Sequence, residues 1–276
     1  MALTRIFVDG SYFVFYRFYA IMQWWRNARP ELCGPDFIPI DNEEFVEKFR
    51  STFVTTLKTL KKKLKLPKDT EVEMLVGKDA PRKTLWRMEI FPEYKACRDK
   101  QNEGFQGGPF FKMAYDEGLF QEGGVSKILS YPTLEADDTI ALSLLNNKPH
   151  GRPAEKTILI ASDHDYLQLL GKVPCSDFQI ISLKMKPLHE PEDNKGPIYL
   201  MEKILSGDKS DGIPSAFPKC GKVTAKKCIE DAAFLESKIS KGGDIVKKNI
   251  RMNKTLIDFT EIPQHLQQGF LNQNWE

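Results

Sequence analysis

Nine carboxylates of this chain stand in five short segments, each of which follows a run of apolar residues. A carboxylate in such a place is costly to bury unless a partner neutralises it, and a hard divalent cation is a partner that carboxylate oxygens bind well. The pattern therefore predicts a metal site assembled from distant parts of the chain. The nine acids are Asp9, Asp79, Glu135, Asp137, Asp138, Asp163, Asp165, Asp208 and Asp211.

Metal-dependent hydrolysis of a phosphodiester needs acids that clamp two cations about 4 Å apart. The segment LEADD places Glu135, Asp137 and Asp138 at the expected start of a helix, where the helix dipole also favours negative charge. Taken alone, this segment also fits an acid-rich helix start, and Asp165 of SDHD also fits a helix cap. The occurrence of all five segments in one chain favours the metal site.

Three apolar runs predict buried strands, at residues 6–8, 72–76 and 157–161, and they lead to Asp9, Asp79 and Asp163. Helical patterns at 10–27, 43–65 and 136–146 lie between or after them. Strands that alternate with helices predict an α/β fold with a parallel sheet. Because ligands of such sheets bind outside the carboxyl ends of the strands, the separate acids are expected to converge there.

Residues 92–124 interrupt this alternation with a long segment rich in loop residues, which contains a basic cluster. An insertion of this length is usually functional or disordered. From about residue 203 the pattern changes to small helices separated by Gly and Pro. We expect a core over residues 1–202, with the insertion at about 92–124, and a helical region over 203–276.

Composition narrows the class of protein. The chain has 276 residues, 41% of them hydrophobic, and its net charge is only +2, so any affinity for nucleic acid must come from local charge. No apolar run reaches the roughly 20 residues that span a bilayer, and we expect an intracellular protein that does not bind membranes. Five scattered cysteines without a CxxC pair argue against disulfides and zinc.

Basic and aromatic residues suggest contacts with nucleic acid. Tyr94, Lys95 and Arg98 lie in the insertion, where the cations are suited to hold a scissile phosphate. A solvated charged helix is the alternative reading of this cluster. The aromatic run at residues 11–25 offers stacking surfaces for single-stranded bases, although most of its rings are expected in the core.

Five blocks in this order resemble the 5′ nuclease superfamily of flap endonucleases and 5′→3′ exonucleases, most of all its bacteriophage and bacterial branch. The blocks are VDGS, KDAPRKTLWRMEIFPEYKACRDK, LEADDTIA, SDHDYLQLL and GDKSDGIP with the following PKCGKVTAKK, within residues 4–230. The resemblance implies a PIN-like parallel central sheet flanked by helices. It also implies a helical arch and a helix–three-turn–helix at residues 212–227.

The resemblance also implies roles for particular residues. The ligands implied for a first metal ion are Asp9, Asp79, Glu135 and Asp137. Those implied for a second ion are Asp163, Asp165 and Asp211, with Asp138 and Asp208 supporting both sites. Catalysis is expected to depend on Lys95, Arg98, Asp137 and Asp163. DNA contacts are expected from Arg82, Lys83, Tyr94, Lys219, Gly221, Lys222, Lys226 and Lys227.

The implied activity is structure-specific hydrolysis of DNA or RNA-primer phosphodiesters, with two Mg²⁺ or Mn²⁺ ions, in replication or repair. Branched, nicked or 5′-flap DNA and RNA-primed DNA are the expected partners of a monomer, and no clamp or single-strand-binding protein can be read from the chain. The family often binds K⁺ in its helix–three-turn–helix, but Lys219 stands here in place of a glycine. The alternatives are a PIN-like endoribonuclease and an inactive protein that binds branched DNA.

Overall fold

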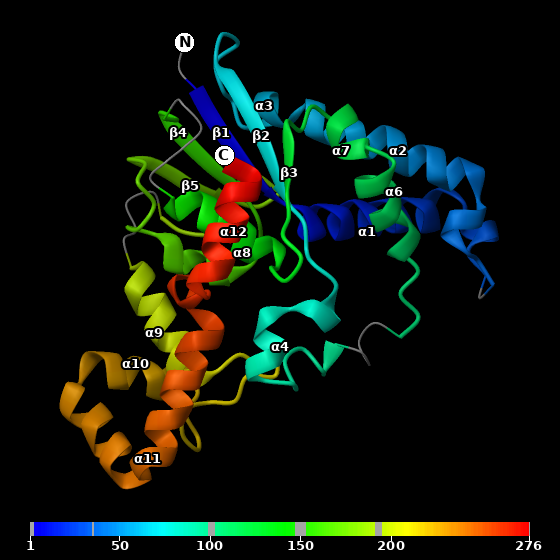
Figure 1. Ribbon diagram of the computed structural model, residues 1–276. Coiled ribbons are helices and arrows are strands. Elements are labelled where there is room, and N and C mark those ends of the chain that lie inside the picture. Colours follow the sequence, from blue (N-terminus) through cyan, green and yellow to red (C-terminus); the bar gives the residue numbers. More distant parts are fainter. Residues whose placement is uncertain (1–2, 35, 99–102, 147–152, 191–194, 276) are drawn as a thin grey trace.

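A five-stranded parallel sheet lies at the centre of the structure, a computed structural model that describes residues 3–34, 36–98, 103–146, 153–190 and 195–275. The spatial order of the strands is β3-β2-β1-β4-β5 (Figure 1). Their bounds are β1 Leu3–Asp9, β2 Glu71–Gly77, β3 Lys127–Leu129, β4 Lys156–Ile160 and β5 Asp177–Ile181. The predicted parallel α/β sheet is confirmed, whereas the two edge strands β3 and β5 were not predicted.

Alternate residues of the inner strands face two separate cores. Ile6 and Val8 of β1 pack into one core with Met74 of β2, whereas Phe7 packs into the other with Leu75. Successive side chains of a strand point to opposite faces, so a sheet buried on both sides needs continuous apolar runs. This is why the inner strands read as unbroken hydrophobic segments in the sequence.

One face of the sheet is covered by helices from the first half of the chain. They are α1 Gly10–Ala28, α2 Glu43–Lys58, α3 Leu60–Lys63, α6 Gly108–Asp116 and α7 Leu119–Glu122, with the short turns η1 Pro30–Leu32 and η2 Pro39–Asp41 nearby. The predicted helices at 10–27 and 43–65 are present, and the second is interrupted at Thr59.

The predicted arch at 92–124 is only partly an insertion, because α6 and α7 pack into this first core. Phe110 and Phe120 have no exposed surface, and Met113 of α6 is also buried. Phe110 and Met113 are three residues apart, which places them on the same buried face of α6. Residues 99–102 of the expected arch lie outside the described part of the chain.

The opposite face is covered by α8 Ala136–Leu145, η4 His164–Leu169, η5 Phe259–Glu261 and α12 Gln264–Trp275. The last helix therefore packs on the sheet rather than with the helical region predicted for 203–276. Phe270 is fully buried there, and the Asn274 amide donates to the Ser130 carbonyl over 3.2 Å. The division of the chain near residue 202 stays a prediction, with α12 on the core side.

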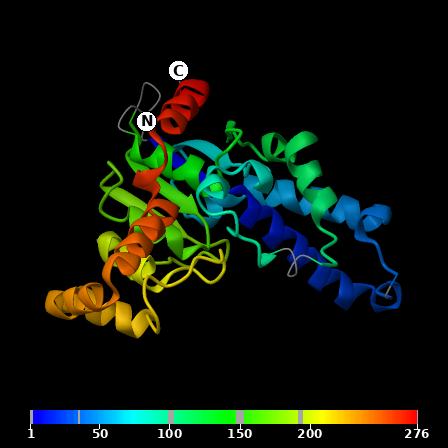
Figure 2. The ribbon, with the colours of Figure 1, turned by 60° about the horizontal axis from the view of Figure 1, so that its bottom comes forward.

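A second group of helices lies beyond the carboxyl ends of the strands. They are α9 Gly196–Ser206, α10 Lys222–Glu230 and α11 Ala232–Ile257, which bends at Gly243 where φ is 58°. Near them lie η3 Arg82–Thr84 and α4 Trp86–Ile90. Figure 2 shows α1 and α2 extending to one side of the sheet and α10 and α11 to the other. Among the described residues, no helix is both long and apolar enough to cross a membrane.

Candidate functional site

Three predicted acids lie at or just beyond the carboxyl ends of the inner strands. Asp9 ends β1 and caps α1 by accepting a 2.9 Å hydrogen bond from the Tyr12 amide. Asp79 follows β2, and Asp163 follows β4. The chain proceeds from β1 to β2 and β3 on one side and places β4 and β5 on the other, so a topological switch point lies between β1 and β4. Crevices at such points are where open α/β sheets bind ligands.

The start of α8 brings the LEADD acids to the same edge. Glu135 is the N-cap residue of α8 and forms a capping box with Asp138. Asp79 accepts a 2.8 Å hydrogen bond from the Ala136 amide, which ties the end of β2 to the first turn of α8. One oxygen from each of Glu135, Asp137 and Asp138 lies within 4.8 Å of the others, so the acids of this segment are clustered.

A buried arginine that the sequence analysis did not select organises this cluster. Arg87 of α4 is 2% exposed and donates two 2.7 Å bonds to the two oxygens of Asp138. It also donates to Glu135 over 2.8 Å and, through Nε, to the Leu256 carbonyl over 2.7 Å. Because Trp86 also donates to Asp138 over 3.0 Å, this acid is fully engaged by protein groups and does not open onto the cleft.

A cleft of about 530 Å³ joins the acids of the strand ends to those of α8. It brings together seven of the predicted site residues, which are Asp9, Asp79, Lys95, Arg98, Glu135, Asp137 and Asp163. Ser11, Phe15 and Lys203 also line it. The Ser11 hydroxyl donates a hydrogen bond to Asp79.

The acids of the cleft differ in the direction in which their surroundings shift the pKa. Burial, together with the charge of Asp79, raises the pKa of Asp9 from its ordinary value of 3.8 to about 6. Burial and the charge of Glu135 raise the pKa of Asp137 well above its usual range. Burial alone would also raise the pKa of Glu135, but the cations of Lys95 and Arg87 outweigh it and lower that pKa.

This donor set fits hard divalent cations. The cleft offers carboxylate oxygens from several segments, and such oxygens are the preferred ligands of Mg²⁺. Raised pKa values at Asp9 and Asp137 mean that the charged forms lack sufficient partners within the protein. A bound cation supplies that partner.

The remaining predicted acids lie beside the cleft and are held by basic side chains. Lys203 of α9, which sequence reasoning missed, forms ion pairs with both Asp165 and Asp208, at 2.5 Å for the latter. Asp211 accepts a 2.5 Å bond from Arg98 and a 3.1 Å bond from the Tyr94 hydroxyl. Lys203 carried no sequence signal, because one of its partners lies 38 residues away.

The basic cluster of the insertion rests directly on the acids. Lys95 pairs with Glu135, and its own backbone has a positive φ of 59° while its amide donates to the Asp211 carbonyl over 2.8 Å. Tyr94 was predicted to contact DNA, but it is 2% exposed and its hydroxyl donates to Glu135 over 2.9 Å. In this structure Tyr94 therefore has no exposed face for DNA and acts as a structural link between the acids.

The basic residues predicted after the acidic blocks lie on the surface near α10. Gly221 is the N-cap residue of α10, and a second cavity of about 1060 Å³ lies between this turn and α9. Lys219 adopts a left-handed φ of 61°, a conformation that usually favours glycine. The exposed members of the predicted set are Lys83, Lys219, Gly221, Lys222, Lys226 and Lys227, whereas Arg82 is half-buried and donates to the Tyr94 carbonyl over 3.3 Å.

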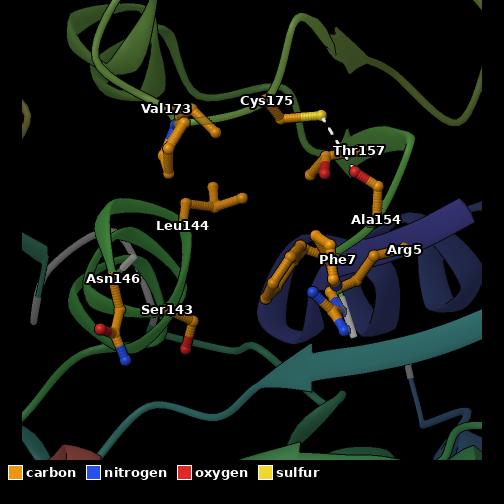
Figure 3. A pocket seen from close by; sticks show the side chains of 11 residues that line it. Arg5, Phe7, Ser143, Leu144, Asn146, Ala154, Thr157, Val173 and Cys175 are labelled. Atoms are coloured by element: carbon orange, nitrogen blue, oxygen red, sulfur yellow. Dashed lines mark hydrogen bonds between the residues drawn. The ribbon is translucent and has the colours of Figure 1, made fainter. Parts of the chain in front are cut away.

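A further cavity lies at the opposite, amino end of the strands. Figure 3 shows it between Arg5, Leu144 and Cys175, and its volume is about 140 Å³. None of the described residues that line it is a carboxylate. The chemistry expected from the sequence therefore belongs to the acidic cleft.

Comparisons with known proteins identify relatives of this chain. The chain is 28% identical over 176 residues to flap endonuclease Xni of Vibrio parahaemolyticus. This match covers 62% of this chain and 64% of that protein. It is 28% identical over 191 residues to DNA polymerase I of Mycobacterium tuberculosis. That match covers 62% of this chain but only 19% of the polymerase. The match thus spans less than two thirds of these relatives.

Two solved structures share the fold. One is a bacteriophage T5 protein co-crystallised with metal ions, with a TM-score of 0.61 and 17% identity over 98% of this chain and 97% of the other. The second is a pseudo-enzyme–product complex of the T5 flap endonuclease with DNA and metal ions, with a TM-score of 0.60 and 17% identity over the same shares. Residues 4–192 match the family described as 5′-3′ exonuclease, N-terminal resolvase-like domain. The chain therefore belongs to the 5′-3′ exonuclease family.

Proposed function

We propose that this protein is a structure-specific 5′ nuclease, a metal-dependent phosphodiesterase with 5′→3′ exonuclease and flap endonuclease activity. The observation that carries the proposal is the cleft in which acids from the strand ends and α8 face Lys95 and Arg98. Hydrolysis of a phosphodiester needs this combination, because both cation ligands and positive charge for the phosphate must lie at one place. Relatives with the names flap endonuclease and DNA polymerase I support it.

Two Mg²⁺ or Mn²⁺ ions are the proposed cofactors. When bound, they would activate a water molecule and stabilise charge at the scissile phosphate. Asp9, Asp79, Glu135 and Asp137 are the proposed ligands of the first ion. Those of the second are Asp163, Asp165 and Asp211. Because Arg87 and Trp86 engage Asp138, we assign it a supporting role, and Asp208 is likewise held by Lys203.

Lys95 and Arg98 are the proposed phosphate contacts. Lys95 is mostly buried, with 12% of its side chain exposed, yet it lines the cleft and carries a positive charge. Burial would lower the pKa of Lys95, but the charge of Glu135 raises it, so the cation persists at neutral pH. A phosphate in the cleft would meet both cations, which would help stabilise the charge of its transition state.

The proposed substrates are branched, nicked or 5′-flap DNA and RNA-primed DNA. Gly221 and the lysines around α10 would grip the duplex through its phosphates, with no preference for sequence. Lys83 and Arg82 would add contacts nearer the cleft. We further propose a monomer, and a K⁺ site in the loop before α10 in which Lys219 takes the left-handed position of a glycine.

The test is cleavage of a 5′-labelled flap duplex in Mg²⁺, beside an EDTA control, single-stranded RNA and blunt duplex. Junction cuts that EDTA abolishes are expected. Cutting of RNA alone would favour a PIN-like endoribonuclease, and flap binding without cleavage would favour an inactive DNA-binding protein.

The variant Asp163→Asn is expected to abolish cleavage and to spare flap binding, because it removes one proposed ligand from an exposed position. Asp177→Asn is its matched control, since Asp177 pairs with Lys156 over 3.0 Å on β5, away from the cleft. Near wild-type cleavage by Asp163→Asn, measured as the single-turnover rate, would refute the proposed ligand set.

A further inference from the structure

Tyr166 is a fully buried tyrosine next to the acidic cleft, and its hydroxyl donates a 3.1 Å hydrogen bond to Oδ2 of Asp9. Tyr166 belongs to η4, which follows β4, whereas Asp9 ends β1. These strands are neighbours in the sheet (Figure 1), although the two residues lie 157 positions apart in the chain. The bond therefore crosses the switch point at which the cleft lies.

Asp9 accepts hydrogen bonds at both of its carboxylate oxygens. The Tyr12 amide donates to Oδ1 over 2.9 Å, and the Tyr166 hydroxyl donates to Oδ2. The first bond comes from the helix that Asp9 caps, and the second comes from a distant segment of the chain. Since each carboxylate oxygen has two lone pairs, each keeps one for a cation in the cleft, which Asp9 lines. The two donors thus fix the direction in which the remaining lone pairs point.

The ring of Tyr166 is itself held in place by packing. It lies in the same core as Phe7, and its centre is 6.2 Å from that of the Phe259 ring. Gln168, also of η4, donates to the Ile257 carbonyl and accepts from the Phe259 amide, each over 3.0 Å. A hydroxyl on a ring that neighbours lock in this way has a defined position, as the support of a ligand requires.

Tyr166 shares its short helix with acids of the other proposed ligand set. Asp163 is the N-cap residue of η4, and Asp165 lies within it. Both are proposed ligands of the second ion, whereas Asp9 is a proposed ligand of the first. Two-metal hydrolysis needs the ions about 4 Å apart, so the relative position of the two ligand sets matters. The Tyr166 hydroxyl is a direct link between the segments that carry them.

We propose that Tyr166 is a positioning residue, which orients Asp9 for the first cation at a fixed place relative to the ligands of the second. The inference rests on the proposed metal-dependent function. A tyrosine hydroxyl keeps its proton at neutral pH, so it donates to the carboxylate without contacting the ion. The loss of such a partner of a metal ligand typically lowers metal affinity by about 10-fold to 100-fold.

The test is binding of Mn²⁺ to the protein alone, followed by the electron paramagnetic resonance signal of the free ion. Tyr166→Phe keeps the buried ring and removes only the hydroxyl. Ser143→Ala is the matched control, because it removes a hydroxyl that donates to the Thr139 carbonyl over 2.7 Å and lines the cavity at the amino end of the strands. Urea unfolding in EDTA checks that each variant is folded.

Tyr166→Phe is expected to weaken Mn²⁺ binding at one of two sites by about tenfold. The Mg²⁺ concentration that gives half-maximal flap cleavage should rise by a similar factor. Cleavage at saturating Mg²⁺ and flap affinity in EDTA should match the wild type, because the hydroxyl does not face the cleft and contacts no phosphate. Ser143→Ala should bind Mn²⁺ like the wild type.

A double variant separates positioning from a general structural effect. If Tyr166 acts through Asp9, adding Tyr166→Phe to Asp9→Asn should leave the remaining Mn²⁺ affinity unchanged, because the partner of the hydroxyl is already altered. A displaced η4 would instead weaken the second site in both backgrounds. Weaker binding by the double variant than by Asp9→Asn, or wild-type binding by Tyr166→Phe alone, would overturn the positioning role.

Failure of this inference and failure of the proposed function give different results. If the wild type binds Mn²⁺ and cleaves flaps, and Tyr166→Phe has the same Mn²⁺ affinity, only the positioning role is refuted. If the wild type binds no Mn²⁺ and cleaves no flap, the metal-dependent nuclease is refuted and the positioning role with it.

Discussion

The substitution Asp9→Asn should stabilise the protein in the absence of divalent cations. Asp9 is held in the cleft with its pKa raised from 3.8 to about 6, first by burial and then by the charge of Asp79. This difference corresponds to about 3 kcal/mol of unfavourable free energy in the folded state when the carboxylate is ionised. Asparagine can still accept the 2.9 Å bond from the Tyr12 amide, so the cap of α1 should survive.

The sign of the effect depends on pH. A carboxyl group with a raised pKa binds more protons in the folded state than in the unfolded state, so stability falls as the pH rises from 3.8 through about 6. The penalty is absent below this window and complete above it. Asp9→Asn should therefore match the wild type at about pH 3 and exceed it by about 2–3 kcal/mol at about pH 8, several degrees in Tm.

The assay is urea unfolding in EDTA at a series of pH values, followed by the same series in Mg²⁺. In Mg²⁺ the order should reverse, because binding to the folded state stabilises only the protein that keeps its ligand. A variant that is less stable than the wild type at about pH 8 in EDTA, or a difference that does not change with pH, would refute the reasoning.

Two further substitutions, each with a control, test the ion-pair network behind the cleft and the loop before α10. Arg87→Met leaves the fully buried Asp138 without its cation, so urea unfolding should show a free energy of unfolding that is about 3–5 kcal/mol lower. The control is Arg29→Met, in the exposed pair with Glu44, which should lower it by less than about 1 kcal/mol. Equal losses would contradict the buried network. Lys219 has a left-handed φ of 61°, so Lys219→Gly should leave the free energy of unfolding unchanged or raise it by up to about 1 kcal/mol. The same change at the exposed Lys226, in the interior of α10, should lower it by about 1 kcal/mol. A similar loss at both sites would refute the glycine-like role of Lys219.

The sequence predicted the acidic cleft well because its acids follow long apolar runs. Asp9, Asp79 and Asp163 come after strands buried on both faces, and such strands are easily recognised from composition. The edge strands were harder to predict. Lys127–Leu129 has three residues, and Asp177–Ile181 is mostly half-buried, so neither produces a continuous apolar run.

The partners of the acids could not be predicted, because ion pairs leave no periodic pattern. Arg87 stands alone in a mostly apolar segment and meets Asp138 across 51 residues of chain. A lone arginine within an apolar run was the one available signal, and it does not reveal its partner. Likewise, the exposure of Tyr19 and the burial of Phe18 depend on how α6 and the segment at Phe105 pack on α1.

The position of α12 has a consequence for synthesis of the protein. This helix covers the face of the sheet that carries α8, yet it lies near the end of the described chain, whereas β1 lies at its start. While the ribosome still holds residues 264–275, that face keeps an exposed apolar surface, because Phe270 does not yet cover it. Contacts between such distant segments form late in folding. The helix that carries Glu135 and Asp137 therefore gains its full support only after residues 264–275 have emerged, so the nascent chain should acquire its metal-binding geometry only after that point.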